Sequence, residues 1–166
     1  AVMETGAEKI PVIATLDGLL RGLIRDGYPV PERFKIADID PRVEEYENCL
    51  YVSIHQNKYE DSSIWGAQTF YSPNDNESKS LAQFIQSSIT TELQPSNKRL
   101  IKQSGTSIYV LYNATKPAVM VECGFISNHN ELSQLKAEEY QSKMAFSIML
   151  GIINYNISEV TNGTEV

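Results

Sequence analysis

The chain contains few of the residues from which several common functional sites are built. It has two cysteines, Cys49 and Cys123, and two histidines, His55 and His129. Two thiols are too few for a disulfide scaffold or a cysteine-based zinc site, and we interpret both as small buried hydrophobic residues. A P-loop, a dinucleotide-binding glycine pattern, a GxSxG elbow and an HExxH helix are also missing from the sequence.

Long apolar runs and an excess of positive charge are missing as well. The longest apolar run, 144–153, is interrupted by Ser147 and Gly151, so we expect no transmembrane segment. With 14 basic and 21 acidic residues the formal net charge is −7, which argues against nucleic acid as a partner. The first residues, AVMETGAEKI, lack a basic and an apolar region, so we expect no signal peptide in this chain.

The apolar residues that are present predict helices alternating with strands. Strands are predicted over 49–54, 67–71, 108–112 and 118–122, and helices over 10–26, 81–93, 130–136 and 139–155. Such alternation indicates an α/β fold, with a single layer of mostly parallel sheet flanked by helices. We assign residues 1–156 to one domain, which 166 residues are enough to form, and 157–166 to a flexible polar tail.

Two of the predicted strands end on side chains that can take part in chemistry. The run CLYVSI leads into His55, and the run PAVMV leads into Glu122. In α/β sheets the reactive groups gather at the carboxyl ends of strands, so we expect these two residues to share one edge of the sheet. This coincidence is the first functional signal in the sequence.

Each of these residues also has a simpler interpretation. A histidine at a strand end is more often a hydrogen-bonded structural residue than a metal ligand, although imidazole is the commonest neutral ligand. A glutamate there can be a solvated residue at the rim, but burial beside an apolar run raises its pKa and suits a general base. Glu8 is explained by a favourable position at the start of a helix, and His129 by exposure at the surface. A Cys123–His55 dyad lacks the basic surroundings that would activate the thiol.

The motifs SIHQN, GAQTFY and PAVMVECGFISN resemble the zinc-dependent N-acetylmuramoyl-L-alanine amidase family, type 3. The resemblance covers most of 49–155 and is nearest to the germination-specific spore-cortex amidases. It implies a zinc ion, held by His55 and by Glu8 at the start of the first helix, with Glu122 as the catalytic base. Residues of the loop after His55, namely Asn57, Tyr59 and Trp65, are expected to bind substrate.

Two departures from the family pattern stand beside this resemblance. The N-terminal GHGG segment is absent, with its zinc histidine and the first strand of the sheet, so we expect the chain to be N-terminally incomplete. The region before SIHQN, about 31–48, lacks the usual Thr-Arg motif and looks compressed. Either the chain is trimmed or discontinuous, or it is a degenerate relative of the family, and we favour missing residues.

The resemblance implies a peptidoglycan hydrolase that uses Zn²⁺ to cleave the amide between N-acetylmuramic acid and the L-alanine of the stem peptide. The expected location is extracytoplasmic, in the cell wall, periplasm or spore cortex, with peptidoglycan and a regulatory protein as partners. One alternative is a catalytically inactive amidase-like module that binds peptidoglycan or a regulatory protein. Another is a zinc carboxypeptidase that cuts a different bond of the stem peptide.

Overall fold

The computed structural model describes residues 2–5, 8–11, 19–23, 37–40, 49–74 and 76–162, with side chains from residue 49 onward. The chain divides into two compact units, Ala1–Glu47 and Asn48–Val166. The assignment of residues 1–156 to one catalytic domain stays a prediction. None of the described helices is long and apolar enough to cross a membrane.

The described residues of the first unit form two antiparallel strand pairs. Strand β1 pairs with β2 and strand β3 pairs with β4, with bounds Val2–Thr5, Glu8–Pro11, Leu19–Leu23 and Ala37–Asp40. The predicted helix over 10–26 is therefore wrong at 10–11 and 19–23, and its remaining residues lie outside the described ranges. Gly22 disfavours a helix and sits where the register shifts between Arg21 and Leu23, as glycine often does at a bulge.

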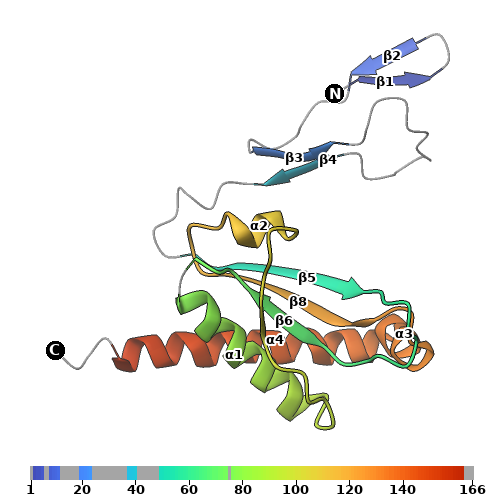
Figure 1. Ribbon diagram of the computed structural model, residues 1–166. Coiled ribbons are helices and arrows are strands. Elements are labelled where there is room, and N and C mark those ends of the chain that lie inside the picture. Colours follow the sequence, from blue (N-terminus) through green and yellow to red (C-terminus); the bar gives the residue numbers. More distant parts are fainter. Residues whose placement is uncertain are drawn as a thin grey trace. The chain divides into compact units, whose positions relative to one another are not determined.

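The second unit is built on a four-stranded sheet with the order β5-β8-β6-β7. Figure 1 labels its strands β5, β8 and β6. The strands span Tyr51–Asn57 (β5), Gln68–Tyr71 (β6), Lys102–Gln103 (β7) and Ala118–Phe125 (β8). The α/β class is confirmed. The strand directions are mixed, because β5–β8 and β6–β7 are parallel whereas β6–β8 is antiparallel. The loop between β5 and β6 is shorter than a parallel crossover requires, so β6 returns in the opposite direction.

Four helices accompany this sheet: α1 (Asn76–Glu92), α2 (Tyr109–Tyr112), α3 (His129–Lys136) and α4 (Glu138–Asn162). The predicted strand over 108–112 is wrong, because this segment forms the short helix α2, in which Leu111 packs against the sheet. Helix α4 continues past the predicted end at Tyr155 and includes 157–162 of the predicted tail. No glycine or proline occurs between Gly151 and Gly163 to end it earlier.

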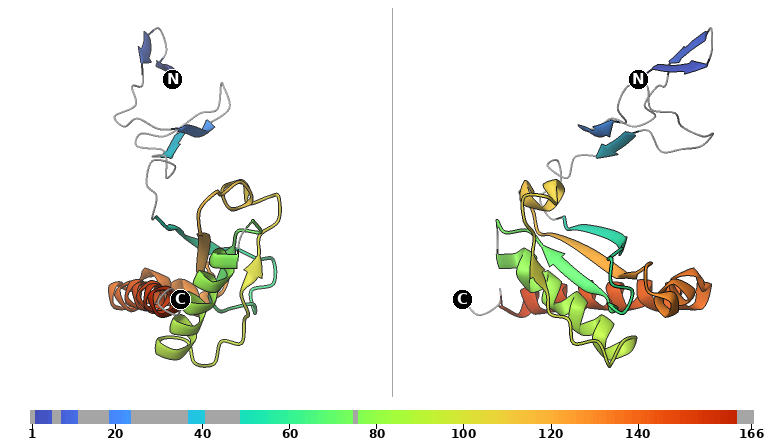
Figure 2. Two further views of the ribbon diagram at one scale, coloured as in Figure 1. Left: turned by 90° about the vertical axis from the view of Figure 1, so that its left-hand side faces the viewer. Right: turned by 45° about the vertical axis from the view of Figure 1, so that its right-hand side comes forward.

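The two faces of the sheet are covered differently, as Figure 2 shows. Helices α1 and α4 pack on one face, where alternate β8 residues Val119, Val121 and Cys123 join the main core. On the other face, Ala118 and Met120 pack against Leu111 of α2. Because side chains alternate along a strand, Glu122 lies on the α2 face, beyond the part that this cluster covers.

The contact between α1 and α4 is close at Gly151. A Cβ atom at this position would lie 2.5 Å from Ile85 Cα and 2.9 Å from Ile85 N, both of which are backbone atoms of α1. Backbone atoms cannot move aside as the end of a flexible side chain can. Gly151 therefore sets how closely the two helices approach.

We predict that Gly151→Ala lowers the free energy of unfolding by about 1–3 kcal/mol through overpacking. A loss of stability would be informative, because alanine is normally favoured over glycine inside a helix by about 1 kcal/mol. Urea denaturation measures the effect. Gly105→Ala is the control, since a Cβ there meets nothing within 4 Å, and an unchanged or increased stability of the Gly151 variant would contradict the packing argument.

Candidate functional site

Strands β5 and β8 bring His55 and Glu122 next to each other. The two residues are register partners in this parallel pair, so their side chains emerge on the same face of the sheet. His55 is exposed and Glu122 is half-buried. Gln68 of β6 is the partner of Glu122 on its other side. The sheet thus presents imidazole, carboxyl and amide groups in one row across three neighbouring strands.

The carboxyl group of Glu122 lies in a poorly solvated position. Its Oε2 atom is buried, and no residue in the described part of the chain forms a hydrogen bond with it. Burial raises the pKa of Glu122 above its ordinary value, and the charge of nearby His55 opposes this rise. This raised pKa agrees with the rise expected from the sequence. A carboxyl group of this kind exchanges protons closer to neutral pH than a solvated one does.

The neighbouring thiol of Cys123 points to the opposite, core side of the sheet and is 3% exposed. Burial, together with the adjacent Glu122 carboxylate, raises the pKa of Cys123 to about 11. A thiol with this pKa is almost entirely protonated at neutral pH and is a poor nucleophile. The structure therefore gives no support to a Cys123–His55 dyad.

The end of β8 is fixed by Glu131 of α3, a residue to which the sequence analysis gave no role. Glu131 is 4% exposed. Its Oε1 accepts a hydrogen bond from Gly66 N at 3.0 Å and its Oε2 accepts one from Phe125 N at 2.7 Å. A Cβ at Gly124 would lie 2.7 Å from Oε1, so a small residue is needed where the strand passes this carboxylate.

The signal for Glu131 was present in the sequence as Asn-x-x-Glu. Asn128 caps α3, because its Oδ1 accepts hydrogen bonds from the backbone N–H groups of Asn130 and Glu131. In a capping box, the acidic residue three positions later returns to the cap itself. Here it reaches instead to Phe125 and to Gly66, which is 65 positions away along the chain.

The loop between β5 and β6 carries the aromatic residues predicted to bind substrate. Tyr59 and Trp65 are 57% and 44% exposed, so their rings are available for contact. Tyr59 N donates a hydrogen bond to Ser127 Oγ at 3.1 Å. Asn57 lies at the end of β5, where its backbone carbonyl accepts from Ile126 N at 2.8 Å. The loop is thus attached to the turn that follows Glu122.

Arg99 is a second residue that the sequence analysis did not single out. Its Nε donates to the Trp65 carbonyl oxygen at 2.8 Å, and its Nη1 donates to Gln68 Oε1 at 3.2 Å. The guanidinium group also lies 4.7 Å from the centre of the Phe125 ring. Arg99 therefore joins the aromatic loop to the strand beside Glu122, and no local pattern in the sequence predicts these contacts.

The remaining predicted residues lie elsewhere. Glu8 lies in strand β2 of the first unit and does not begin a helix; its role as a metal ligand stays a prediction. His129 is exposed at the start of α3, as expected for a surface residue. Within the described ranges, no three His, Cys, Asp or Glu side chains gather in a way that could hold a metal ion.

Comparison with known proteins identifies the class of this α/β protein. Residues 24–154 match the family model described as N-acetylmuramoyl-L-alanine amidase. The germination-specific N-acetylmuramoyl-L-alanine amidase of Bacillus subtilis is 36% identical over 126 residues, which are 74% of this chain and 52% of that protein. The chain belongs to the N-acetylmuramoyl-L-alanine amidase family.

Solved structures agree with this assignment. The CwlD amidase from Clostridioides difficile, solved in complex with the GerS lipoprotein, is similar with a TM-score of 0.64 and 39% identity, covering 66% of this chain and 55% of that one. The N-acetylmuramoyl-L-alanine amidase from Clostridium difficile 630 has a TM-score of 0.59 and 32% identity, covering 64% and 57%. The chain thus spans about half the length of the first of these relatives.

We predict that Glu131→Gln lowers the free energy of unfolding by about 1.5–3 kcal/mol, the range for hydrogen bonds to a charged group. The glutamine amide offers one acceptor oxygen in place of two. Its NH₂ group would face a backbone N–H, so one of the two hydrogen bonds is lost. Urea denaturation gives the value, with Glu92→Gln at the exposed end of α1 as the matched control. Equal loss of stability in both variants would show that the buried carboxylate has no special role.

Proposed function

We propose that this chain is part of a peptidoglycan hydrolase that cleaves the amide between N-acetylmuramic acid and the L-alanine of the stem peptide. The single observation that carries the proposal is the register pairing of His55 with Glu122 in a chain of the amidase family. The amidase names of the relatives in Bacillus subtilis and Clostridioides difficile support the same reaction.

The donor groups of the site fit part of a zinc centre. The exposed imidazole of His55 is a suitable ligand, and Glu8 is proposed as a second one. The Glu122 carboxyl next to His55 has a buried oxygen without a hydrogen-bond partner in the described residues, so it is free to meet a polar group of water or substrate. When bound, zinc would lower the pKa of a coordinated water toward about 7 and polarise the scissile carbonyl.

Glu122 would act as the general base and then as the general acid. Its carboxylate would take a proton from the attacking water and deliver that proton to the leaving amine of L-alanine. The raised pKa of Glu122 suits both steps, because a group that titrates nearer neutral pH holds and releases the proton more evenly. Gln68 and Arg99 would keep the neighbouring strand and loop in position.

The biological setting is proposed from the relatives. One relative is named as germination-specific, and another was solved with a lipoprotein bound. We therefore propose an extracytoplasmic role in the spore cortex, with a regulatory protein as a partner.

A catalytically inactive binding module is the second candidate. It is favoured by one observation: within the described residues, His55 is the histidine that pairs with Glu122, whereas His129 begins α3. Such a module would bind peptidoglycan without cutting it. Zinc analysis and product analysis separate the two candidates.

We predict that Glu122→Gln lowers kcat on peptidoglycan at least about a hundredfold, the usual contribution of general acid–base catalysis. Zinc content should stay equal to that of the parent, whereas His55→Ala should lose metal. Mass spectrometry of released fragments identifies the bond that is cut and excludes carboxypeptidase activity. A Glu122→Gln variant as active as its parent, or an intact parent protein that binds wall fragments without cutting them, would reject the enzyme proposal.

We predict further that Trp65→Ala lowers kcat/KM on wall fragments up to about tenfold, mainly through KM, because an exposed aromatic face stacks on sugar rings. The Trp65 carbonyl, which holds Arg99, is kept in this variant. Phe146→Ala is the control, since Phe146 is also exposed but belongs to α4. Unchanged steady-state kinetics in the Trp65 variant would refute the proposed contact.

A further inference from the structure

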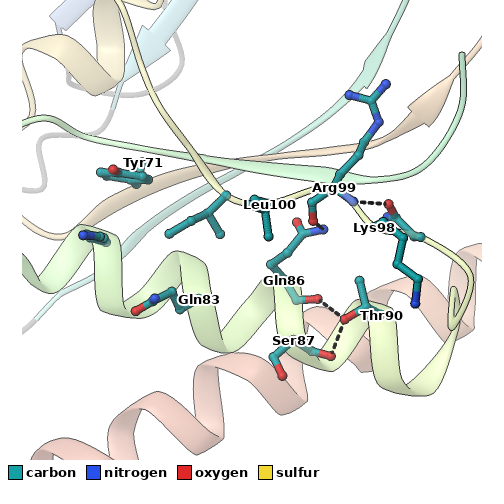
Figure 3. A pocket seen from close by; sticks show the side chains of 11 residues that line it. Tyr71, Gln83, Gln86, Ser87, Thr90, Lys98, Arg99 and Leu100 are labelled. Atoms are coloured by element: carbon teal, nitrogen blue, oxygen red, sulfur yellow. Dashed lines mark hydrogen bonds between the residues drawn. The ribbon is translucent and has the colours of Figure 1, made fainter.

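A cavity of about 660 Å³ lies between α1 and the segment 97–101 (Figure 3). This volume is within the range of about 300–1,000 Å³ typical of ligand sites. One wall is a stripe of α1 that carries Lys79, Gln83 and Ser87, and the opposite wall carries Lys98 and Leu100. His55, Glu122, Tyr59 and Trp65 are not among the residues that line it.

The charge of the cavity is opposite to that of the chain. The chain has a formal net charge of −7. None of the 11 described residues that line the cavity is acidic, whereas both of its walls carry a lysine, Lys79 and Lys98. Two cations on facing walls, without a carboxylate between them, favour an anionic ligand that extends from one wall to the other.

The buried amide side chains of the cavity are hydrogen-bonded within the fold. Gln86 is 6% exposed, and its Oε1 accepts hydrogen bonds from Thr69 N at 2.8 Å and Thr69 Oγ1 at 3.0 Å. Its Nε2 donates to the carbonyl oxygens of Ala67 at 3.1 Å and Arg99 at 3.2 Å. Asn97, 5% exposed, accepts from Arg99 N at 2.9 Å. These buried amides are committed to the fold, so the more exposed groups of Lys79, Gln83 and Ser87 remain for a ligand.

The cavity and the Glu122 site are on opposite faces of the sheet. Tyr71, which lines the cavity, packs with the core on the α1 side, whereas Glu122 lies on the α2 face. The Arg99 side chain extends away from the cavity (Figure 3) and reaches Trp65 and Gln68 beside the catalytic face. A ligand in the cavity is therefore distinct from the group that Glu122 would act on.

We propose that this cavity binds an acidic stem peptide of the cell wall, separate from the one that is cleaved. The inference rests on the proposed function, because that function supplies the polymer. A stem peptide carries carboxylates at several points along a short extended backbone, which matches lysines on both walls. Gln83 and Ser87 can pair with its peptide groups, and Leu100, which is 79% exposed, offers an apolar contact.

The test measures binding of the soluble peptide N-acetyl-L-Ala-γ-D-Glu-meso-diaminopimelate to the whole chain. Calorimetry gives the affinity, and NMR shifts of backbone amides give the place of binding. Shifts are expected at Lys79, Gln83 and Leu100, and affinity should fall as salt is raised. The Lys79→Glu/Lys98→Glu variant should bind about tenfold more weakly or worse. Lys136→Glu, a reversal at an exposed lysine of α3, is the matched control and should bind as the parent does.

Two further peptides make the result decisive. The same peptide with its carboxylates converted to amides should not bind, and the all-L peptide acetyl-Ala-Glu-Glu should bind more weakly than the stem peptide. Equal binding of the all-L peptide would overturn the stem-peptide assignment in favour of an acidic protein segment. No binding, or an affinity that the lysine reversals leave unchanged, would overturn the proposal that the cavity is a binding site. The peptide titration follows amide shifts at Lys79, Gln83 and Leu100, whereas the cleavage assay follows the bond broken at the Glu122 site, so failure of the catalytic proposal and failure of this site are distinguishable.

Discussion

Strand β8 hydrogen-bonds to β5 on one side and to β6 on the other, and the alternation of its side chains decides where chemistry can occur. Val119, Val121 and Cys123 bury against α1 and α4, which fixes the strand in the middle of the core. Glu122 must then face the other way. Its carboxyl group is half-buried on the α2 face, and this burial raises its pKa above the ordinary value.

The carboxylate of Glu131 fixes the other parts of the site relative to that strand. A buried charge is costly unless it is hydrogen-bonded, and Glu131 meets this need with the backbone N–H groups of Gly66 and Phe125. One donor belongs to the aromatic loop and the other to the end of β8. The requirement of one buried carboxylate therefore couples the position of the loop to the position of Glu122.

The sequence predicted the parts of this arrangement that depend on local patterns. The apolar runs before His55 and Glu122 were visible as local patterns, and parallel pairing of β5 with β8 brought the two residues together. The predicted strand ends were too early, because β5 continues to Asn57 and β8 to Phe125. The helix predicted over 10–26 was wrong because its leucines and isoleucines recur with a helical period. Strands form instead where Glu8–Pro11 and Leu19–Leu23 pair with other segments. Arg99 was not predicted, because its contacts with Trp65 and Gln68 span more than 30 positions.

Segment 97–101 shows how one stretch of backbone can serve two faces of a thin sheet. The carbonyl oxygen of Arg99 accepts from Gln86 on the α1 face, and its guanidinium donates to Trp65 and Gln68 beside the Glu122 face. Gln68 in turn donates to the Leu100 carbonyl at 2.8 Å, which closes the connection from the other side. Since each of these groups has its partner within the fold, the segment is held by both faces at once. The cavity wall and the support of the aromatic loop are therefore parts of a single hydrogen-bonded structure.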